Sequence, residues 1–123
     1  MIPREINDFI THITPKYPVI TITGPRQSGK TTLVKEIFRE KPYVNLEHLE
    51  TREFARQDPI GFLKKYPEGA VIDEVQRVPE LFSYIQVIVD EAQQMGMFVL
   101  TGSSQFNLLS SITQSLAGRT ALC

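Results

Sequence analysis

The stretch from residue 19 to residue 38 constrains the fold of this chain more than any other. It starts with the run VITIT, in which every residue is β-branched, and continues through the loop GPRQSGKTT into a segment with apolar residues at helical spacing. A β-branched run is typical of a strand that is buried on both faces, and a single apolar stripe is typical of a helix that packs on a core. The sequence therefore predicts a strand, a loop and a helix in direct succession.

The loop between this strand and this helix fits the pattern G-x-x-x-x-G-K-[ST] of a phosphate-binding loop. Glycines let the backbone N–H groups wrap a polyphosphate, and the start of a helix adds about half a positive charge. We expect Lys30 to reach the β- and γ-phosphates, the Thr31 hydroxyl to bind Mg²⁺, and Thr32 to hold the α-phosphate side. A glycine turn that only joined strand to helix would not require this lysine and threonine. The residues expected to contact the nucleotide are Gly24, Pro25, Arg26, Gln27, Ser28, Gly29, Lys30, Thr31 and Thr32.

Three more strands are predicted along the chain, at residues 43–47, 70–73 and 97–101. A short amphipathic helix precedes the first strand, helical pieces capped by Asp58 follow the second, and a longer helix runs from near Pro79 to a turn at Gly96. Strands that alternate with helices imply an α/β fold with a parallel sheet covered on both sides. The ligand of such a sheet lies at the carboxyl ends of its strands.

Polar side chains follow two of these strands at that edge. We expect Asp73 to bind Mg²⁺, directly or through water, and Glu74 to orient and deprotonate the attacking water. Thr101 or Ser103, at the end of the fourth strand, is expected to contact the γ-phosphate or the attacking water. The simpler alternatives are that the two acids are solvated loop residues and that the segment after the fourth strand is a capped turn. The catalytic candidates are Glu74, Lys30, Thr101 and Ser103.

Other polar residues carry weaker signals. Arg119 is expected either to act as an arginine finger or to pair with a surface acid, and Gln76 and Arg77 are weaker candidates still. The two histidines, His12 and His48, are isolated, so no Cys/His spacing indicates a zinc site.

Composition limits the class of protein without naming a partner. The formal net charge is −1, and no interleaving of aromatic and basic residues indicates a nucleic-acid surface. The only cysteine is Cys123, which is compatible with a reducing compartment. The N-terminus has charged residues where a signal peptide would be apolar, and no stretch of about 20 apolar residues occurs. We therefore expect a cytoplasmic protein.

Taken together, VITITGPRQSGKTTLVKEI, YVNLE, AVIDEVQRVPELFSYIQ and FVLTGSSQ followed by SLAGR make the chain resemble a known family. It is similar to the N-terminal ATPase domain of a large prokaryotic group of AAA-type ATP-binding proteins. The resemblance implies a three-layer P-loop NTPase fold of the additional-strand class, with strand order 5-1-4-3-2. It also implies that Lys30 and Thr31 contact phosphate and Mg²⁺, that Asp73 serves Mg²⁺, that Glu74 activates water, and that Thr101 or Ser103 is the sensor.

The resemblance also bears on the limits of the chain. Family members continue through a fifth core strand into a C-terminal domain, whereas here RTALC is only the beginning of that strand. We expect the fifth strand to be truncated or missing, and the chain to be part of a longer protein. Residues 1–18 are predicted to form a helix and lead-in, and residues 19–123 the ATPase core.

The sequence thus predicts a domain that binds Mg-ATP and hydrolyses it to ADP and phosphate to drive a conformational change. An alternative is a switch or interaction module that binds ATP with negligible turnover. A small-molecule phosphoryl transferase would need an acceptor pocket and a lid, and neither is indicated. ATP is preferred to GTP only by analogy with the family that the chain resembles, since no guanine-reading N-K-x-D segment occurs. The protein partner and assembly into a homo-oligomer stay open.

Overall fold

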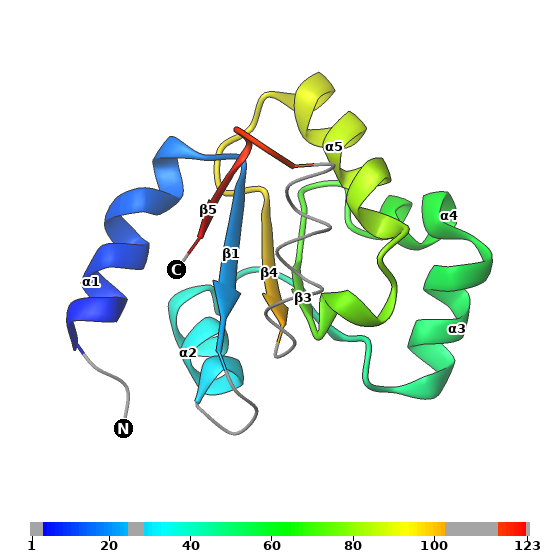
Figure 1. Cartoon of the computed structure of the whole chain (residues 1–123), viewed down its shortest axis with the longest axis horizontal. Coiled ribbons are helices and arrows are strands. Elements are labelled where there is room, and N and C mark those ends of the chain that lie inside the picture. Colours follow the sequence, from blue (N-terminus) through cyan, green and yellow to red (C-terminus); the bar gives the residue numbers. More distant parts are fainter. Residues whose placement is uncertain (1–3, 25–28, 103–115, 123) are drawn as a thin grey trace.

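Strands that are far apart in the sequence form one parallel sheet at the centre of the molecule (Figure 1). The computed structural model describes residues 4–24, 29–102 and 116–122. Within them the sheet has five strands in the order β2-β3-β4-β1-β5. Their bounds are β1 Val19–Thr23, β2 Tyr43–Asn45, β3 Val71–Asp73, β4 Phe98–Gly102 and β5 Thr120–Leu122. This order is the reverse reading of 5-1-4-3-2, so the predicted fold class is confirmed, with β4 inserted between β1 and β3.

Helices cover both faces of the sheet and complete three layers (Figure 1). On one face, α1 and α2 pack against apolar residues of the sheet such as Ile20 and Val99. On the other face, α3, α4 and α5 pack against residues such as Phe98 and Ile72. The bounds are α1 Arg4–Ile13, η1 Thr14–Lys16, α2 Lys30–Ile37, α3 Leu49–Gln57, α4 Pro59–Lys64, η2 Val75–Arg77 and α5 Leu81–Ala92.

The β-branched run of β1 fits its position in the middle of the sheet, where both of its faces are buried. Val19 faces one core cluster, whereas Ile20 and Ile22 face the other. The strand pairs with β4 along its whole length and with β5 through Val19–Thr21. The fifth strand is thus present as three residues, Thr120–Leu122, so the expectation that it could be missing is wrong.

Two local predictions have different outcomes. Asp58 caps α4 as expected, because its Oδ1 accepts a hydrogen bond of 3.0 Å from the backbone N–H of Gly61. The prediction that the long helix ends in a turn at Gly96 is wrong. That helix ends at Ala92, and Gln93 takes the left-handed conformation after it with φ 52°. Gly96 instead turns the chain into β4, and its N–H donates to the carbonyl of Tyr17.

Candidate nucleotide-binding site

The carboxyl ends of β1, β3 and β4 lie side by side at one edge of the sheet. Thr23 of β1 pairs with Gly102 of β4, and Ile72 of β3 pairs with Leu100 of β4. Gly24, Asp73 and Thr101 are therefore brought to the same edge, as the sequence predicts. The predicted site residues Pro25, Arg26, Gln27, Ser28 and Ser103 lie outside the described residues.

Helix α2 begins at this edge, directly after the loop that follows β1. Gly29 precedes it with φ 88°, a backbone conformation that strains any residue with a Cβ atom. The carbonyl of Gly29 accepts the first helical hydrogen bond, from Leu33, at 2.9 Å. Lys30 is buried in the first turn, whereas Thr31 and Thr32 are exposed. The glycine thus allows the left-handed backbone directly before α2, and two hydroxyl groups lie at the helix start.

Three hydroxyl groups from three different elements converge on the carboxylate of Asp73. Thr31 at the start of α2 donates to Oδ2 at 2.7 Å, and the phenol of Tyr43 in β2 donates to the same oxygen at 2.5 Å. Thr101 of β4 donates to Oδ1. Asp73 is 1% exposed, so these contacts replace the water that its carboxylate loses on folding.

Opposing effects act on the protonation of this carboxyl group. Burial raises the pKa of Asp73, but the hydrogen bonds from Thr101, Tyr43 and Thr31 and the positive charge of Lys30 lower it, and the net pKa lies below the ordinary value. Burial also raises the pKa of the Tyr43 phenol, and its hydrogen bond to Asp73 raises it further. The pair therefore consists of an ionised carboxylate and a neutral phenol at neutral pH.

Glu74 lies next to this cluster in an uncommon backbone conformation. Its φ of 59° and ψ of 45° are left-handed, and its residue exposure is 6%. The backbone N–H of Glu74 donates to Oγ1 of Thr101 at 3.2 Å, and its carboxylate Oε1 accepts from Nε2 of Gln76 at 3.0 Å. The hydroxyl of Thr101 therefore contacts both acids, donating to one and accepting from the other.

Sequence reasoning missed Tyr43 as a member of this cluster. Its ring also lies under the ammonium group of Lys35, with Nζ 4.4 Å from the ring centroid. No motif marks a tyrosine at the start of a strand. The sequence-based indication for Tyr43 was the expected position of its strand beside the acidic strand. In the observed register, Tyr43 pairs with Val71 and Asn45 pairs with Asp73.

A family model described as an AAA domain matches residues 16–123 of the chain. The chain belongs to this AAA domain family. The expected resemblance to AAA-type P-loop ATPases is thereby confirmed.

Two curated mycobacterial proteins are similar to this AAA domain. They are the uncharacterized protein Rv2008c of Mycobacterium tuberculosis and the uncharacterized protein Mb2031c of Mycobacterium bovis. Each is 36% identical over 106 residues, which are 85% of this chain. The chain spans about a quarter of the length of these relatives, 24%. The similarity therefore concerns one part of each relative.

Solved structures share the fold. The Walker-type ATPase PABY2304 of Pyrococcus abyssi superposes with a TM-score of 0.63 at 17% identity, over 99% of this chain and 53% of that one. A DNA replication initiation factor gives a TM-score of 0.60 at 16% identity, over 96% of this chain and 44% of that one. PCH-2 of C. elegans gives 0.55 at 16% identity, over 96% and 40%. At these identities the likeness shows the P-loop ATPase fold alone.

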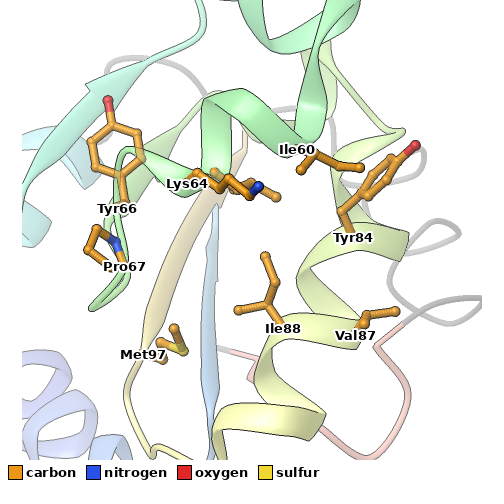
Figure 2. Close-up of a pocket in the computed structure, with 9 residues that line it drawn as sticks. Ile60, Lys64, Tyr66, Pro67, Tyr84, Val87, Ile88 and Met97 are labelled. Atoms are coloured by element: carbon orange, nitrogen blue, oxygen red, sulfur yellow. The ribbon is translucent and has the colours of Figure 1, made fainter.

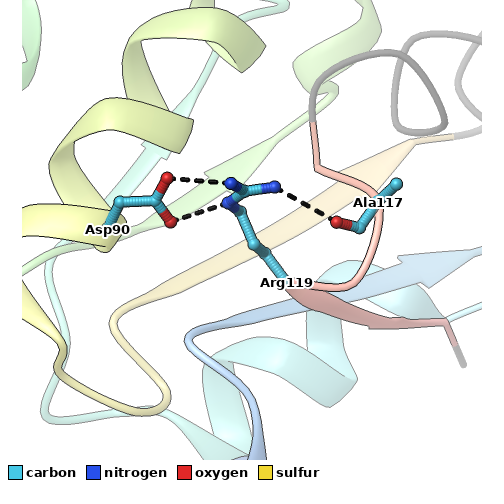
Figure 3. A network of polar contacts seen from close by, with 3 residues as sticks. All are labelled: Asp90, Ala117 and Arg119. Atoms are coloured by element: carbon cyan, nitrogen blue, oxygen red, sulfur yellow. Dashed lines mark hydrogen bonds and ion pairs between the residues drawn. The ribbon is translucent and has the colours of Figure 1, made fainter.

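Arg119 of this AAA domain lies away from the phosphate loop. Its carbonyl accepts a hydrogen bond from the N–H of Val19, the first residue of β1, so it is at the amino edge of the sheet. Figure 3 shows its guanidinium paired with both carboxylate oxygens of Asp90, at 2.6 and 2.9 Å, and bonded to the carbonyl of Ala117. Of the two expectations, pairing with a surface acid is the one observed, and an arginine finger for the chain's own site does not fit this position.

An apolar groove of about 520 Å³ lies between α4 and α5 (Figure 2). It is bounded by Tyr66 and Pro67, which precede β3, and by Met97, which precedes β4. These positions are at the amino edge of the sheet, and Lys64 is the one charged residue among those that line the groove. The groove is therefore separate from the site around Asp73, and its lining is mainly apolar.

Two further classes of site are absent from the described part of the AAA domain. Within residues 4–24, 29–102 and 116–122, no group of three or more His, Cys, Asp or Glu side chains is placed to hold a metal ion. None of the helices in these ranges has the length and hydrophobicity required to cross a bilayer.

Proposed function

We propose that this AAA domain binds Mg-ATP at the carboxyl edge of its sheet and hydrolyses it to ADP and phosphate. The observation that carries the proposal is the convergence of Thr31, Asp73 and Thr101, which come from α2, β3 and β4 and share direct hydrogen bonds. A hydroxyl at a helix start, a buried carboxylate and a polar residue of the central strand are groups that phosphoryl transfer in P-loop enzymes requires. The match to the family model supports the same conclusion.

The phosphates would be held by the start of α2 and the loop before it. The backbone N–H groups of Gly24, of residues 26–29, and of Thr31 and Thr32 would bind phosphate oxygens, with the helix dipole adding positive charge. Lys30 would reach the β- and γ-phosphates. Its charge already lowers the pKa of Asp73, which supports a position close to the acidic side of the site.

Thr31 and Asp73 have the chemistry of a Mg²⁺ site. Thr31 Oγ1 and Asp73 Oδ2 lie 2.7 Å apart, and hydroxyl and carboxylate oxygens are ligands that Mg²⁺ prefers. The lowered pKa of Asp73 keeps the carboxylate ionised, as a cation site needs. When bound, Mg²⁺ would neutralise negative charge on the phosphate oxygens.

Glu74 is the proposed general base. It would take a proton from the attacking water, whose oxygen bonds to the γ-phosphorus while the bond to ADP breaks and its electron pair leaves on the β-phosphate oxygen. Thr101 or Ser103 would contact the γ-phosphate or this water. The hydroxyl of Thr101 also holds the carboxylate of Asp73 and the backbone of Glu74 in place.

The wider biological role is proposed on the same basis. Residues 1–18 would serve as a helix and lead-in, and residues 19–123 as the ATPase core. Hydrolysis would drive a conformational change that acts on a protein partner, either another protein or a second copy of the chain. We place this activity in the cytoplasm.

The test is calorimetry and thermal unfolding of the chain with Mg-ATP, together with phosphate release from the same samples. Ligand at about 1,000 times its dissociation constant should stabilise the fold by roughly 4 kcal/mol. Lys30→Ala should abolish binding, whereas Lys64→Ala, which removes an exposed lysine of α4, should not. Glu74→Gln should keep binding and lose phosphate release.

Each outcome separates the functions under consideration. Binding with phosphate release that Glu74→Gln abolishes would support the ATPase. Binding that Lys30→Ala abolishes, without any phosphate release, would identify the alternative, a nucleotide-dependent switch. Binding that survives Lys30→Ala would contradict the proposed site.

A further inference from the structure

The side-chain amide of Gln76 contacts the carboxylate that is proposed to activate water. Its Nε2 lies 3.0 Å from Oε1 of Glu74. The nitrogen has to be the group that faces the carboxylate, because an amide oxygen has no hydrogen to donate. The contact therefore fixes the orientation of the amide, with its nitrogen on Glu74 and its oxygen directed elsewhere.

The turn that carries these two side chains is anchored from both sides. Glu74 begins η2 in a left-handed conformation, and Val75 and Val78 are fully buried in the core. The carbonyl of Arg77 accepts a hydrogen bond of 3.1 Å from Arg56 in α3. Because buried valines and this contact hold the turn, the amide of Gln76 is not required to fix the backbone.

The other end of the amide has an unusual environment. Oε1 of Gln76 is buried, and within the described part of the chain it has no hydrogen-bond partner. A buried acceptor without a partner destabilises a fold, and an apolar side chain of similar size would avoid that loss. A polar group that lowers stability at a buried position is typical of a functional site, where function rather than stability determines the residue.

We propose that Gln76 is a positioning residue for hydrolysis, whose amide holds the carboxylate of Glu74 in the orientation that receives the proton of the attacking water. This inference rests on the function proposed above. The chemistry of the step is unchanged: the proton passes to Glu74, the water oxygen bonds to the γ-phosphorus, and ADP leaves with the electron pair of the broken bond. Gln76 acts through Glu74, because its amide restricts the rotamers available to that side chain.

The deciding variant is Gln76→Met, which keeps the length of the side chain and removes both polar atoms. We expect its dissociation constant for Mg-ATP and its KM to stay within twofold of wild type, while kcat falls at least tenfold. The midpoint of urea unfolding should stay equal or rise, because the buried unpartnered oxygen is removed. Gln57→Met, at the exposed end of α3, is the matched control and should change none of these quantities.

The results distinguish this inference from the proposed function. Phosphate release that needs Glu74 but is unchanged in Gln76→Met would overturn the role of Gln76 alone, as would a lowered urea midpoint with an unchanged kcat. Wild-type release that Glu74→Gln does not reduce would overturn the proposed function and this inference together.

A second measurement tests the contact without any turnover. In a ¹⁵N spectrum, the side-chain amide signals of Gln76 should shift in Glu74→Ala and stay in place in Glu68→Ala, which removes an exposed acid. Signals of Gln76 that do not respond to the loss of the Glu74 carboxylate would overturn the proposal.

Discussion

The hydroxyl of Thr31 donates a 2.7 Å hydrogen bond to Oδ2 of Asp73, which lies 42 positions later in the sequence. Thr31 belongs to α2, the helix after β1, whereas Asp73 ends β3, and β4 lies between β1 and β3 in the sheet. Thr101 of β4 meets the same carboxylate from its own position between them. The carboxylate of Asp73 therefore links α2, β3 and β4 through direct hydrogen bonds.

Replacing Thr101 by valine should destabilise the fold, although the shape of the side chain is kept. The change leaves Oδ1 of Asp73 and the backbone N–H of Glu74 without the hydroxyl that they share. A buried polar group that loses its partner costs about 1–3 kcal/mol. Thr101→Ser keeps the hydroxyl and should lose only about 0.8 kcal/mol for the methyl group. Urea unfolding of the two variants checks this, and a valine variant as stable as the serine variant would contradict it.

The stability contributed by Asp73 should depend on pH in a defined direction. Its pKa in the folded protein lies below the ordinary value of 3.8. The ionised carboxylate therefore stabilises the fold above the ordinary pKa, and this contribution is lost as pH falls through the lower pKa of the folded state. We expect wild type to be more stable than Asp73→Asn at neutral pH, and the difference to shrink below about pH 4. Urea unfolding across this range is the measurement, and a difference that does not change with pH is the contrary result.

The backbone at Glu74 should be more stable with glycine than with alanine. Both substitutions remove the carboxylate, but a residue with a Cβ atom loses about 1–2 kcal/mol in the left-handed conformation, and glycine does not. Glu74→Gly should therefore unfold at a higher urea concentration than Glu74→Ala, while both fail to release phosphate. Equal midpoints would show that the left-handed conformation of Glu74 is relaxed in the alanine variant.

Two glycines with positive φ should respond differently to alanine. Gly69 has φ 92°, and a Cβ atom there would lie 1.9 Å from the carbonyl oxygen of Met97, whereas Gly118 has φ 79° and its Cβ would meet no described atom within 4 Å. Gly118→Ala should lose only the conformational term of about 1–2 kcal/mol. Gly69→Ala must also displace the backbone before β4, so we expect a much larger loss, measured by circular dichroism during urea unfolding. Similar losses at both positions would argue against this close approach.

The parts of the fold that were predictable are those set by local pattern. The β-branched run of β1, the glycine and lysine of the loop and the acids after β3 each have a spacing with a physical meaning, and parallel topology then brings their ends together. The convergence of Thr31 and Asp73 follows from these rules without any knowledge of side-chain positions.

The parts that were not predictable depend on tertiary packing. Gln93 ends α5 in a left-handed conformation that sequence rules assign to glycine, so the helix is shorter than its pattern suggests. Tyr43 reaches Asp73 only because β2 and β3 pair in one register. The sequence leaves two possible roles for Arg119. Its ion pair with Asp90 depends on the position of β5 relative to α5, which only the folded chain shows.

The hydroxyls of Thr21 and Thr120 meet at 2.8 Å although they are 99 positions apart in the chain. Both sheet neighbours of β1, namely β4 and β5, come late in the sequence. A ribosome that adds about 5–20 residues per second needs roughly 5–20 s to make the segment between these two threonines. For most of that interval, until β4 is made at residues 98–102, a strand of β-branched residues has neither of its partner strands. The strand order therefore delays the pairing of β1 until late in synthesis, and until then its free edges can pair with other chains.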